Sequence, residues 1–314
     1  MVAAFTFPGQ GSQLAGMGKM LAEQFIVARM VFEEVDDALN EKLSDVIFEG
    51  PGDILTLTAN AQPALMAVSM AIIRVMENLG LNLESKVKFV AGHSLGEYSA
   101  LCAAGTFSLA DTARLLRIRG NAMQNAVAVG EGAMAALIGL DEQDVEEICE
   151  AVLKDGLCQI ANDNGGGQIV VSGEKKAVDA AVQIASEKGA KRALLLPVSA
   201  PFHSSLMQPA ADVMKDALLS VKKMAPTVPL VANVSVTPES DPERIAMLLV
   251  QQVTGRVRWR ETIEWVSANG VDTLFEVGSG KVLTGLARRI NKNIKGLTIS
   301  TAEEIEGALQ ILGI

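Results

Sequence analysis

One serine of this sequence lies in a setting that can make its hydroxyl group a nucleophile. Residues 92–96 read GHSLG, which matches the pattern G-x-S-x-G around Ser94. In this pattern the serine occupies a tight turn between a strand and a helix, and the two glycines leave space for neighbouring backbone. An apolar run at 87–91 and a helical pattern at 95–104 supply that strand and that helix. The segment predicts that Ser94 attacks a carbonyl carbon, with a structural turn serine as the alternative.

A serine nucleophile needs a base, and the sequence contains two histidines, His93 and His203. The side chain of His93 should point away from Ser94, because the two residues are neighbours on the tight turn. His203 lies in the loop 199–205, which reads SAPFHSS, and is therefore predicted to be the base. The group that orients His203 is left open between an Asp or Glu located between the serine and the histidine and a main-chain carbonyl.

A third candidate, Arg119, lies in a helix that begins with a capping box at 108–111. At 100° per residue its side chain shares the apolar face with Leu115 and Met123, which predicts that it is buried. A buried arginine needs an anionic partner, because an unpaired buried charge is costly. Two partners remain open: an Asp or Glu of the protein in a structural ion pair, and a substrate carboxylate that the guanidinium holds with two hydrogen bonds.

The elements that must position these residues alternate between strand and helix. A strand is predicted at 2–7, followed by a loop that reads PGQG and a helix, and a long helix follows Pro63 and ends at Gly80. Further strands are predicted at 228–234 and 271–277. Apolar strands that alternate with helices are typical of an α/β fold with a buried parallel sheet.

Residues 128–198 interrupt this pattern with an element order of their own. The predicted elements, in chain order, are a strand at 133–140, a helix at 141–153, strands at 158–161 and 168–172, a helix at 175–188 and a strand at 192–198. The order βαββαβ is that of the ferredoxin-like fold. We therefore predict a discontinuous parallel-sheet domain at 1–127 and 199–314, with an inserted ferredoxin-like domain at 128–198.

Composition and charge argue against several kinds of protein. The 314 residues are 49% apolar and carry a formal net charge of −10, which argues against a nucleic-acid partner, because phosphate binding needs a net basic face. Residues 1–8 contain no basic segment and no apolar run approaches the roughly 20 residues of a membrane span, so we expect a cytoplasmic protein with no membrane partner. Cys102, Cys149 and Cys158 predict neither a disulfide framework nor a zinc site, and we expect all three to be buried thiols.

The C-terminal region carries a local excess of positive charge, which we name the basic segment. Between positions 256 and 295 it contains four acidic residues and eight basic ones, namely Arg256, Arg258, Arg260, Lys281, Arg288, Arg289, Lys292 and Lys295. Two interpretations remain open: a solvated helix face, or a surface that binds a polyanionic cofactor or an acidic partner.

Five short segments resemble one known family. They are FPGQGSQ at 7–13, GHSLGEY at 92–98, Arg119-Gly120, FHS at 202–204 and VGSGKVL at 277–283. In this order and spacing they are similar to the malonyl-CoA:acyl-carrier-protein transacylases of bacterial fatty acid synthesis, over almost the whole chain. One departure is that residues 255–259 read GRVRW, where many members carry a proline shortly before the tryptophan. The resemblance implies an α/β-hydrolase-like domain with a ferredoxin-like insert, which agrees with the element order.

The resemblance also implies a reaction and its substrates. Malonyl would pass from coenzyme A to the nucleophile Ser94, with His203 as base, and from there to the phosphopantetheine thiol of an acyl carrier protein. Arg119 would bind the malonyl carboxylate, and Phe202 is similar to the malonyl-selective members rather than to those that take methylmalonyl. Malonyl-CoA and the carrier protein are thus the expected partners, and neither a metal nor a cofactor is expected beyond the coenzyme A thioester.

The remaining site residues follow from the same resemblance. The backbone amides of Gln10 and Leu95 would form the oxyanion hole, and the turn itself already predicts this for the Leu95 N–H, which lies at the start of a helix. Gln252 would orient His203 through its main-chain carbonyl. Asn162, between two strands of the small domain, would line the site.

Three other functions compete with this one. A serine hydrolase, either a thioesterase or an esterase, would use the same serine and histidine, and Arg119 is what favours the malonyl transferase. A nucleotide-binding module is suggested by Gly280-Lys281, but Val282 follows the lysine where a phosphate-binding loop needs Ser or Thr. A non-catalytic interaction module is the third possibility, and an acyl-enzyme would exclude it.

Overall fold

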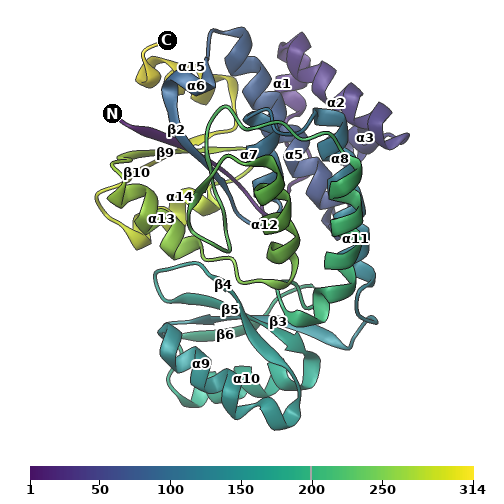
Figure 1. The fold of residues 1–314 in the computed structure, drawn as a ribbon, viewed down its shortest axis with the longest axis vertical. Helices are drawn as coiled ribbons and strands as arrows, with labels where there is room; N and C mark the ends of the chain where they lie inside the picture. The colour runs from purple at the N-terminus through teal and green to yellow at the C-terminus, as the bar shows by residue number, and fades with distance from the viewer. Residues whose placement is uncertain (199) are drawn as a thin grey trace.

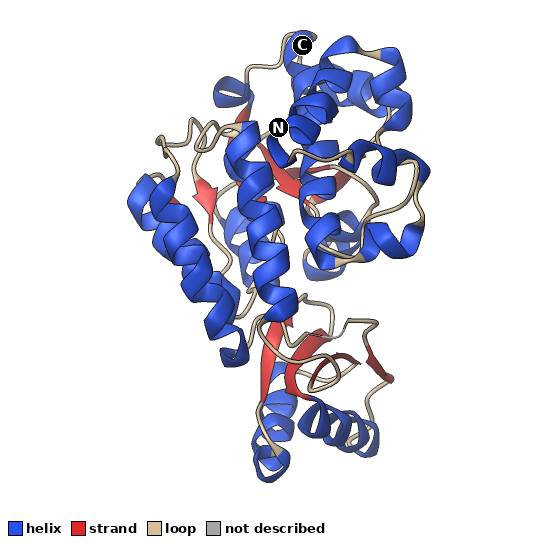
Figure 2. Cartoon of the chain, turned by 90° about the vertical axis from the view of Figure 1, so that its right-hand side faces the viewer, coloured by secondary structure: helices blue, strands red, loops and turns tan. Residues whose placement is uncertain are grey.

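The computed structural model of the chain describes residues 1–198 and 200–314, which form two β-sheets with helices packed around them. Figure 1 shows the larger sheet and its helices in the upper part of the molecule, and the smaller sheet below with two helices on its outer side. Figure 2 shows the same arrangement from the side, with the strands in red. Ser199, where the sequence places the return to the larger domain, lies outside the described residues.

The larger sheet has, within the described chain, the strand order β10-β9-β1-β2-β7-β8. The strands are β1 Ala3–Phe7, β2 Val87–Gly92, β7 Leu230–Val231, β8 Pro238–Glu239, β9 Thr273–Val277 and β10 Lys295–Ile299. Neighbouring strands are parallel except β7 and β8. Phe5 and Ala4 of β1 belong to different apolar clusters, because helices cover both faces of the sheet. The predicted α/β fold with a parallel sheet is confirmed, whereas β8 and β10 were not predicted.

The strand register brings two loops together at one edge of this sheet. Phe7, the last residue of β1, pairs with Gly92, the last residue of β2. Since parallel strands end at the same edge, the loop that carries Gln10 lies beside the turn that carries Ser94.

Helices fill the space around the larger sheet. They are α1 Lys19–Gln24, α2 Ile26–Leu39, α3 Leu43–Glu49, α4 Gly52–Thr56, α5 Thr58–Asn78, α6 Leu83–Lys86, α7 Gly96–Ala103, α8 Leu109–Asn125, α11 Gln208–Ser220, α12 Pro242–Thr254, α13 Trp259–Ala268, α14 Val282–Ile290 and α15 Ala302–Leu312. The capping box predicted for α8 is confirmed, because the Ser108 side chain accepts a hydrogen bond from the Asp111 N–H.

Helix α5 begins ahead of Pro63, so the prediction that a helix starts after this proline was wrong. A proline within a helix has no N–H to donate, which leaves the carbonyl one turn earlier, on Ala59, without its usual partner. Nη1 of Arg117 donates to that carbonyl oxygen at 2.7 Å. A side chain from α8 thus compensates for the proline.

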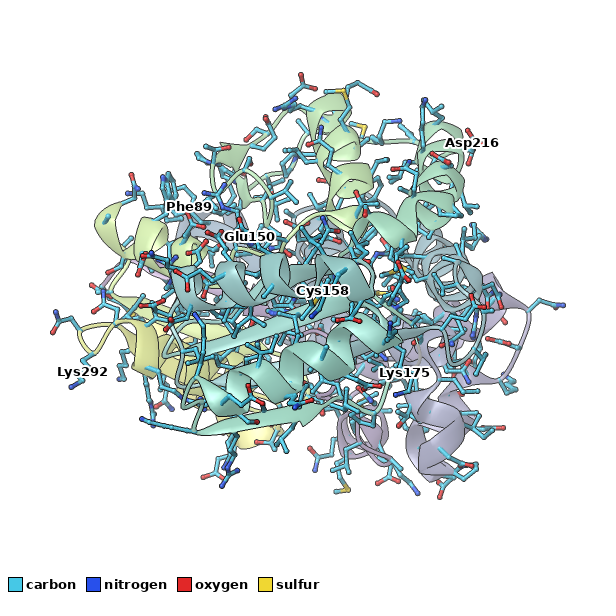
Figure 3. All side chains as sticks on the ribbon, turned by 90° about the horizontal axis from the view of Figure 1, so that it is seen from below. Phe89, Glu150, Cys158, Lys175, Asp216 and Lys292 are labelled. Atoms are coloured by element: carbon cyan, nitrogen blue, oxygen red, sulfur yellow. The ribbon has the colours of Figure 1, made fainter. Side chains whose placement is uncertain are left out.

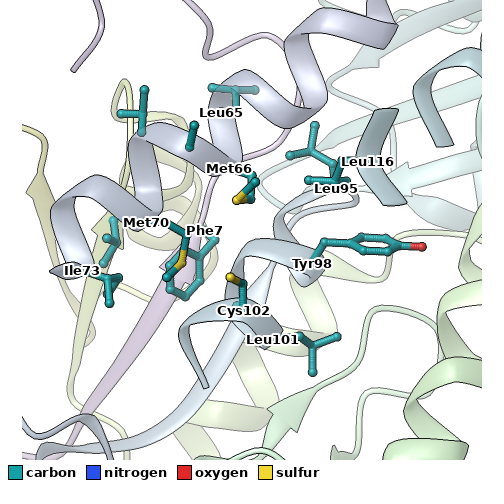
Figure 4. Packing of buried hydrophobic residues seen from close by; sticks show 14 of the residues in the cluster. Phe7, Leu65, Met66, Met70, Ile73, Leu95, Tyr98, Leu101, Cys102 and Leu116 are labelled. Carbon is teal, nitrogen blue, oxygen red and sulfur yellow. The ribbon is translucent and has the colours of Figure 1, made fainter. Parts of the chain in front are cut away.

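Helix α5 is also long and apolar enough to cross a membrane by composition alone, contrary to what the sequence suggested. However, 83% of its most apolar window is buried inside the protein. Figure 4 shows Met66 and Met70 of α5 close to Tyr98 and Cys102 of α7, with Phe7 of β1 beside them. This packing identifies α5 as a core helix.

The smaller sheet has the order β4-β5-β3-β6 in the part of the chain that is described, and its neighbouring strands are antiparallel. Its elements are β3 Gly132–Ile138, α9 Glu142–Ala151, β4 Cys158–Asp163, β5 Gln168–Glu174, α10 Lys175–Glu187 and β6 Arg192–Leu195. An apolar cluster separate from that of the larger sheet lies between these strands and the two helices. The predicted element order is confirmed. Strand β6 is shorter than expected, and Pro197 beyond it cannot donate to the ladder.

The two sheets meet where β4 touches the segment that joins α12 and α13. Val257 forms a bridge with Asn162, donates its N–H to the Ala161 carbonyl oxygen at 2.8 Å and accepts from the Asp163 N–H at 3.0 Å. The segment 255–258 therefore lies against the smaller sheet, and it holds Asn162 next to the larger one.

Candidate active site

Ser94 lies on a tight turn between β2 and α7, with a positive φ of 54°. A side chain at either flanking glycine would collide with backbone. A Cβ on Gly92 would lie 1.8 Å from the carbonyl carbon of Gly96, and one on Gly96 would lie 2.2 Å from the Phe7 oxygen. The two glycines are therefore required by the close approach of the chain on both sides of the serine.

His203 contacts Ser94 directly. Its Nε2 lies 2.8 Å from the Ser94 Oγ, and its Nδ1 lies 2.8 Å from the Gln252 carbonyl oxygen and 3.1 Å from that of Gly255. Carbonyl oxygens accept hydrogen bonds, so Nδ1 carries the proton and Nε2 presents a lone pair to the serine hydroxyl. The sequence left open whether an Asp or Glu or a main-chain carbonyl orients His203. In the structure, main-chain carbonyl oxygens lie beside its Nδ1.

The electrostatic setting keeps His203 neutral. Burial, aided by the positive charge of Arg119, lowers the pKa of His203 to about 3. At neutral pH the imidazole is therefore free to accept a proton from Ser94.

Arg119 is buried as expected, with 1% of its surface exposed. Its Nη1 donates to Gln62 Oε1 at 2.8 Å, and its Nη2 donates to Gln252 Oε1 at 2.8 Å and to Ser94 Oγ at 3.1 Å. The guanidinium also lies over the Tyr98 ring, 5.7 Å from its centroid. Within residues 1–198 and 200–314, it forms no ion pair with an Asp or Glu, and its Nε has no hydrogen-bond partner. The arginine is thus held by neutral oxygen atoms.

Gln252 is the residue that links the base to the arginine. Besides its two contacts to His203 and Arg119, its side-chain Nε2 donates to the Ser94 carbonyl oxygen at 2.8 Å and to Glu97 Oε2. Gln252 itself is buried and lies behind the cavity rather than in its wall.

Two residues that the sequence analysis missed support this arrangement. Glu97, on α7, accepts from the Asn233 N–H at 2.5 Å with the oxygen that does not face Gln252. The Asn233 side chain accepts from the Ser94 N–H at 2.9 Å and donates to the Gly92 carbonyl oxygen at 2.7 Å, which holds both ends of the turn. Burial raises the pKa of Glu97 to about 8, although the N–H groups of Asn233 and Gln252 that donate to it act to lower the pKa. Position 97 was part of a recognised motif, but nothing in the sequence indicated what it contacts.

A cavity of about 260 Å³ opens in front of these groups. Its wall includes four of the predicted site residues that come from different parts of the chain, namely Gln10, Leu95, Arg119 and Asn162, together with Ser94 and His203. Met123, Met134 and Phe202 supply apolar surface. All seven predicted site residues therefore meet at one place, six in the cavity wall and Gln252 directly behind it.

His93 also lines the cavity, but within the described residues its ring forms its hydrogen bond with Asn164 and not with Ser94. Its Nε2 lies 2.9 Å from the Oδ1 of Asn164, the residue after β4, and its ring packs against Trp259 with centroids 5.6 Å apart. Burial lowers the pKa of His93. It serves as a contact between the two sheets.

The structure divides the basic segment into two parts. Arg256, Arg258 and Arg260 form ion pairs with acidic residues of the protein, namely Glu142, Glu146, Asp163, Glu261 and Glu264. Lys281, Arg288 and Arg289 instead line a hollow of about 630 Å³ beside β10. The three arginines are thus paired with the protein's own carboxylates, and binding of an anion or an acidic partner at the other part stays a prediction.

Comparison with known proteins shows which family the chain is similar to. Residues 4–304 match the model of the acyl transferase domain. Two curated proteins named malonyl CoA-acyl carrier protein transacylase are similar over 98% of this chain. The protein of Bacillus subtilis is 46% identical and covered over 96% of its length, and that of Escherichia coli K12 is 42% identical and covered over 99%.

Solved structures show the same likeness. An acyl-carrier-protein-S-malonyltransferase from Bartonella henselae superposes with a TM-score of 0.99 at 83% identity, with complete coverage of both chains. A malonyl-transacylase solved in complex with a type II PKS acyl-carrier protein superposes with a TM-score of 0.96 at 41% identity, over 99% of this chain and 100% of that one.

Proposed function

Since this chain belongs to the family of malonyl CoA-acyl carrier protein transacylases, we propose that Ser94, His203 and Arg119 are the residues with which it moves a malonyl group from coenzyme A to an acyl carrier protein. The chain is an acyltransferase of fatty acid synthesis, and malonyl-CoA and the carrier protein are its partners.

One observation carries the assignment: the Ser94 Oγ lies between the His203 Nε2, at 2.8 Å, and the Arg119 Nη2, at 3.1 Å. The nucleophile thus has a proton acceptor on one side and a fixed positive charge on the other. A malonyl group has its reacting carbonyl at one end and a free carboxylate at the other. A malonyl group therefore fits a site in which a serine hydroxyl lies 3.1 Å from an arginine guanidinium.

In the first half-reaction, the Ser94 Oγ attacks the thioester carbonyl carbon while the His203 Nε2 accepts the hydroxyl proton. The carbonyl oxygen becomes an oxyanion, and its collapse breaks the carbon–sulfur bond. The protonated His203 then gives its proton to the departing coenzyme A sulfur. A malonyl ester on Ser94 and a free thiol are the products, so no metal or resident cofactor is needed for the balance of protons and bonds.

The oxyanion needs two donors beside the serine. We assign them to the backbone N–H groups of Gln10 and Leu95, which come from the loops after β1 and β2. Both residues line the cavity, and in the described chain neither N–H donates a hydrogen bond to the protein. Leu95 also precedes the first turn of α7, where the helix dipole favours negative charge.

We assign Arg119 to the free carboxylate of malonyl. A buried guanidinium that is held by neutral amide oxygens keeps its positive charge uncompensated, and a carboxylate in the cavity would compensate it. Asn162 and Phe202, both in the cavity wall, would border the same acyl group. A neutral acyl group would gain nothing from this arginine.

In the second half-reaction, the phosphopantetheine thiol of the carrier protein replaces coenzyme A. His203 takes the thiol proton, the sulfur attacks the ester carbon, and the Ser94 Oγ leaves with the proton that His203 returns. The order of events is ping-pong, because coenzyme A leaves while the malonyl group remains as an ester on Ser94, before the carrier-protein thiol reacts. Lys281, Arg288 and Arg289 are the residues that we assign to attraction of the acidic carrier protein.

We further propose the finer description of the architecture. The strand order β4-β5-β3-β6 with α9 and α10 on one face supports a ferredoxin-like domain at 128–198, inserted into an α/β-hydrolase-like domain at 1–127 and 199–314. The burial of α5 inside the protein supports a cytoplasmic location.

The test is incubation of the protein with malonyl-CoA, followed by intact mass and peptide mapping. The expected result is one malonyl ester, located on Ser94, which disappears when holo carrier protein is added. A malonyl group that is lost to water as fast as to the carrier protein would indicate a hydrolase, and a protein that gains no mass would disprove the covalent mechanism.

A further inference from the structure

Two of the three cysteines lie next to each other in the core of the smaller sheet. Cys149, on α9, and Cys158, the first residue of β4, have Sγ atoms 4.0 Å apart. Figure 3 looks at this region from below and labels Cys158 between the helix that carries Glu150 and the helix that begins at Lys175. A disulfide has its sulfur atoms roughly 2 Å apart, so a short movement of side chains separates this dithiol from a covalent bond.

The two thiols differ in a way that gives each a separate part in oxidation. Cys149 is half-buried, whereas Cys158 is 3% exposed. Contact with Cys158 and the positive charge of Arg256 lower the pKa of Cys149, while contact with Cys149 and burial raise the pKa of Cys158. A partly exposed thiol whose pKa is lowered, beside a buried second thiol, is the arrangement of oxidant-sensitive cysteine pairs.

We propose that Cys149 and Cys158 are a modification site at which hydroperoxides form a reversible disulfide. The Cys149 thiolate attacks one oxygen of hydrogen peroxide, the O–O bond breaks, and a sulfenic acid and hydroxide are formed; the hydroxide takes up the proton that the thiol had released and becomes water. The Cys158 sulfur then attacks the Cys149 sulfur, and the sulfenic oxygen leaves as a second water with the Cys158 proton. Two thiols are oxidised to one disulfide, and one hydrogen peroxide is reduced to two water molecules.

The oxidised pair would also affect the active site, because α9 is attached to it. Glu142 and Glu146, on the same helix as Cys149, form ion pairs with Arg256. The neighbouring Gly255 carbonyl oxygen lies 3.1 Å from Nδ1 of His203. Glu142 begins α9 and Cys149 lies near its other end, so a shift of the whole helix toward β4 would carry the glutamates with it and disturb an acceptor of the base.

The experiment uses the full chain treated with increasing hydrogen peroxide, followed by alkylation of free thiols, non-reducing peptide mapping and intact mass. The expected result is loss of the Cys149 and Cys158 thiols together, with a disulfide-linked peptide pair and full return on reduction. Cys102, which is buried in the other core and whose pKa burial raises to about 11, serves as the internal control and remains a thiol. The proposal would be overturned if Cys149 were oxidised no faster than Cys102. It would also be overturned if Cys149 were oxidised to a sulfinic acid and no disulfide formed.

Two variants separate the roles of the thiols. Cys158→Ser should leave a sulfenic acid on Cys149 that a dimedone probe traps, whereas Cys149→Ser should leave Cys158 unmodified. Modification of Cys158 in the Cys149→Ser protein at the wild-type rate would contradict the assigned order. The oxidised wild-type protein should acylate Ser94 several-fold more slowly than the reduced one, with recovery on reduction, and the Cys149→Ser protein should be insensitive. An equal acylation rate in both redox states overturns the link to the active site.

Discussion

The main-chain carbonyl oxygen of Gln252 accepts a hydrogen bond of 2.8 Å from Nδ1 of His203, and the side-chain oxygen of the same residue accepts one of 2.8 Å from Arg119. One residue thus fixes both the tautomer of the proposed base and the position of the proposed carboxylate-binding group. Because the backbone serves one function and the side chain the other, substitutions of the side chain can separate specificity from proton transfer.

The Ser94–His203 contact predicts non-additive losses. Ser94→Ala should abolish the acyl-enzyme, and His203→Ala should slow its formation by several orders of magnitude while the fold, checked by circular dichroism, stays intact. Because the two residues act in the same step, removal of the second one costs little further activity. The double variant should therefore be little less active than either single variant. Steady-state transfer rates of all three proteins decide this: if the double variant loses the product of the two single effects, His203 is not the base.

Arg119→Ala should remove charge-assisted hydrogen bonds to the malonyl carboxylate. The expected loss is about 1.5 to 3 kcal/mol, or roughly ten- to a hundred-fold in kcat/KM for malonyl-CoA, and acetyl-CoA should be used as well as before or better. Arg119→Lys keeps the charge but not the planar fork, and should fall between. Parallel kinetics with both donors check this. An equal loss of kcat/KM for malonyl-CoA and for acetyl-CoA would identify Arg119 as a structural residue.

The Glu97–Gln252 contact predicts an effect on donor preference. Glu97 accepts from the Asn233 N–H with one side-chain oxygen and from the Gln252 Nε2 with the other, and the amide of Glu97→Gln has a single oxygen. With its NH2 group toward Gln252, the Gln252 amide must turn or lose that bond, and Arg119 loses its acceptor. One lost hydrogen bond of about 1 kcal/mol should reduce the malonyl-to-acetyl preference by roughly five- to ten-fold. Glu84→Gln, at an exposed position of α6, is the matched control. If the Glu97→Gln protein has the same malonyl-to-acetyl preference as the control, Glu97 does not position Gln252 and Arg119.

The low pKa of His203 predicts a stability that falls with acid. The pKa is about 3 in the folded protein against 6.5 for the ordinary side chain. Between these values the unfolded chain binds more protons than the folded one, so stability is lost as the pH falls through this window. From pH 7.5 to pH 5 the loss from this residue is about 2 kcal/mol.

Urea unfolding at both pH values, compared with His203→Gln, measures this contribution. His93 and Glu97 remain in both proteins, so their titration cancels in the comparison. An equal loss of stability in the two proteins would show that His203 is not held neutral by the fold.

The hollow lined by Arg288 and Arg289 predicts an electrostatic effect on the carrier protein. Replacing both by Ala should raise the carrier KM and flatten its dependence on salt, because screening acts on long-range attraction. Self-acylation from malonyl-CoA should change less. The double variant of Lys215 and Lys222, exposed lysines on and just after α11, is the charge-matched control. A carrier KM at low salt that matches the control would place docking elsewhere.

Local sequence patterns predicted the elements around the site and the residues that we propose to act there. Periodicity and turn residues gave the parallel α/β sheet, the βαββαβ order and the strand–turn–helix around Ser94, because these depend on neighbouring residues. The scarcity of histidines left His203 as the candidate base, and helical spacing placed Arg119 on a buried face. Local rules failed at Pro63, where the helix begins earlier because Arg117, distant in sequence, supplies a hydrogen bond to Ala59.

The contacts among these residues could not be predicted from local patterns. Contacts between segments far apart in the chain set the main-chain carbonyl acceptors of His203, the neutral partners of Arg119 and the roles of Glu97 and Asn233. The pKa values of His203 and Glu97 depend on burial, which no local pattern reports. The same is true of the Cys149–Cys158 pair, because a distance between side chains exists only once the helix and the strand that carry them have packed.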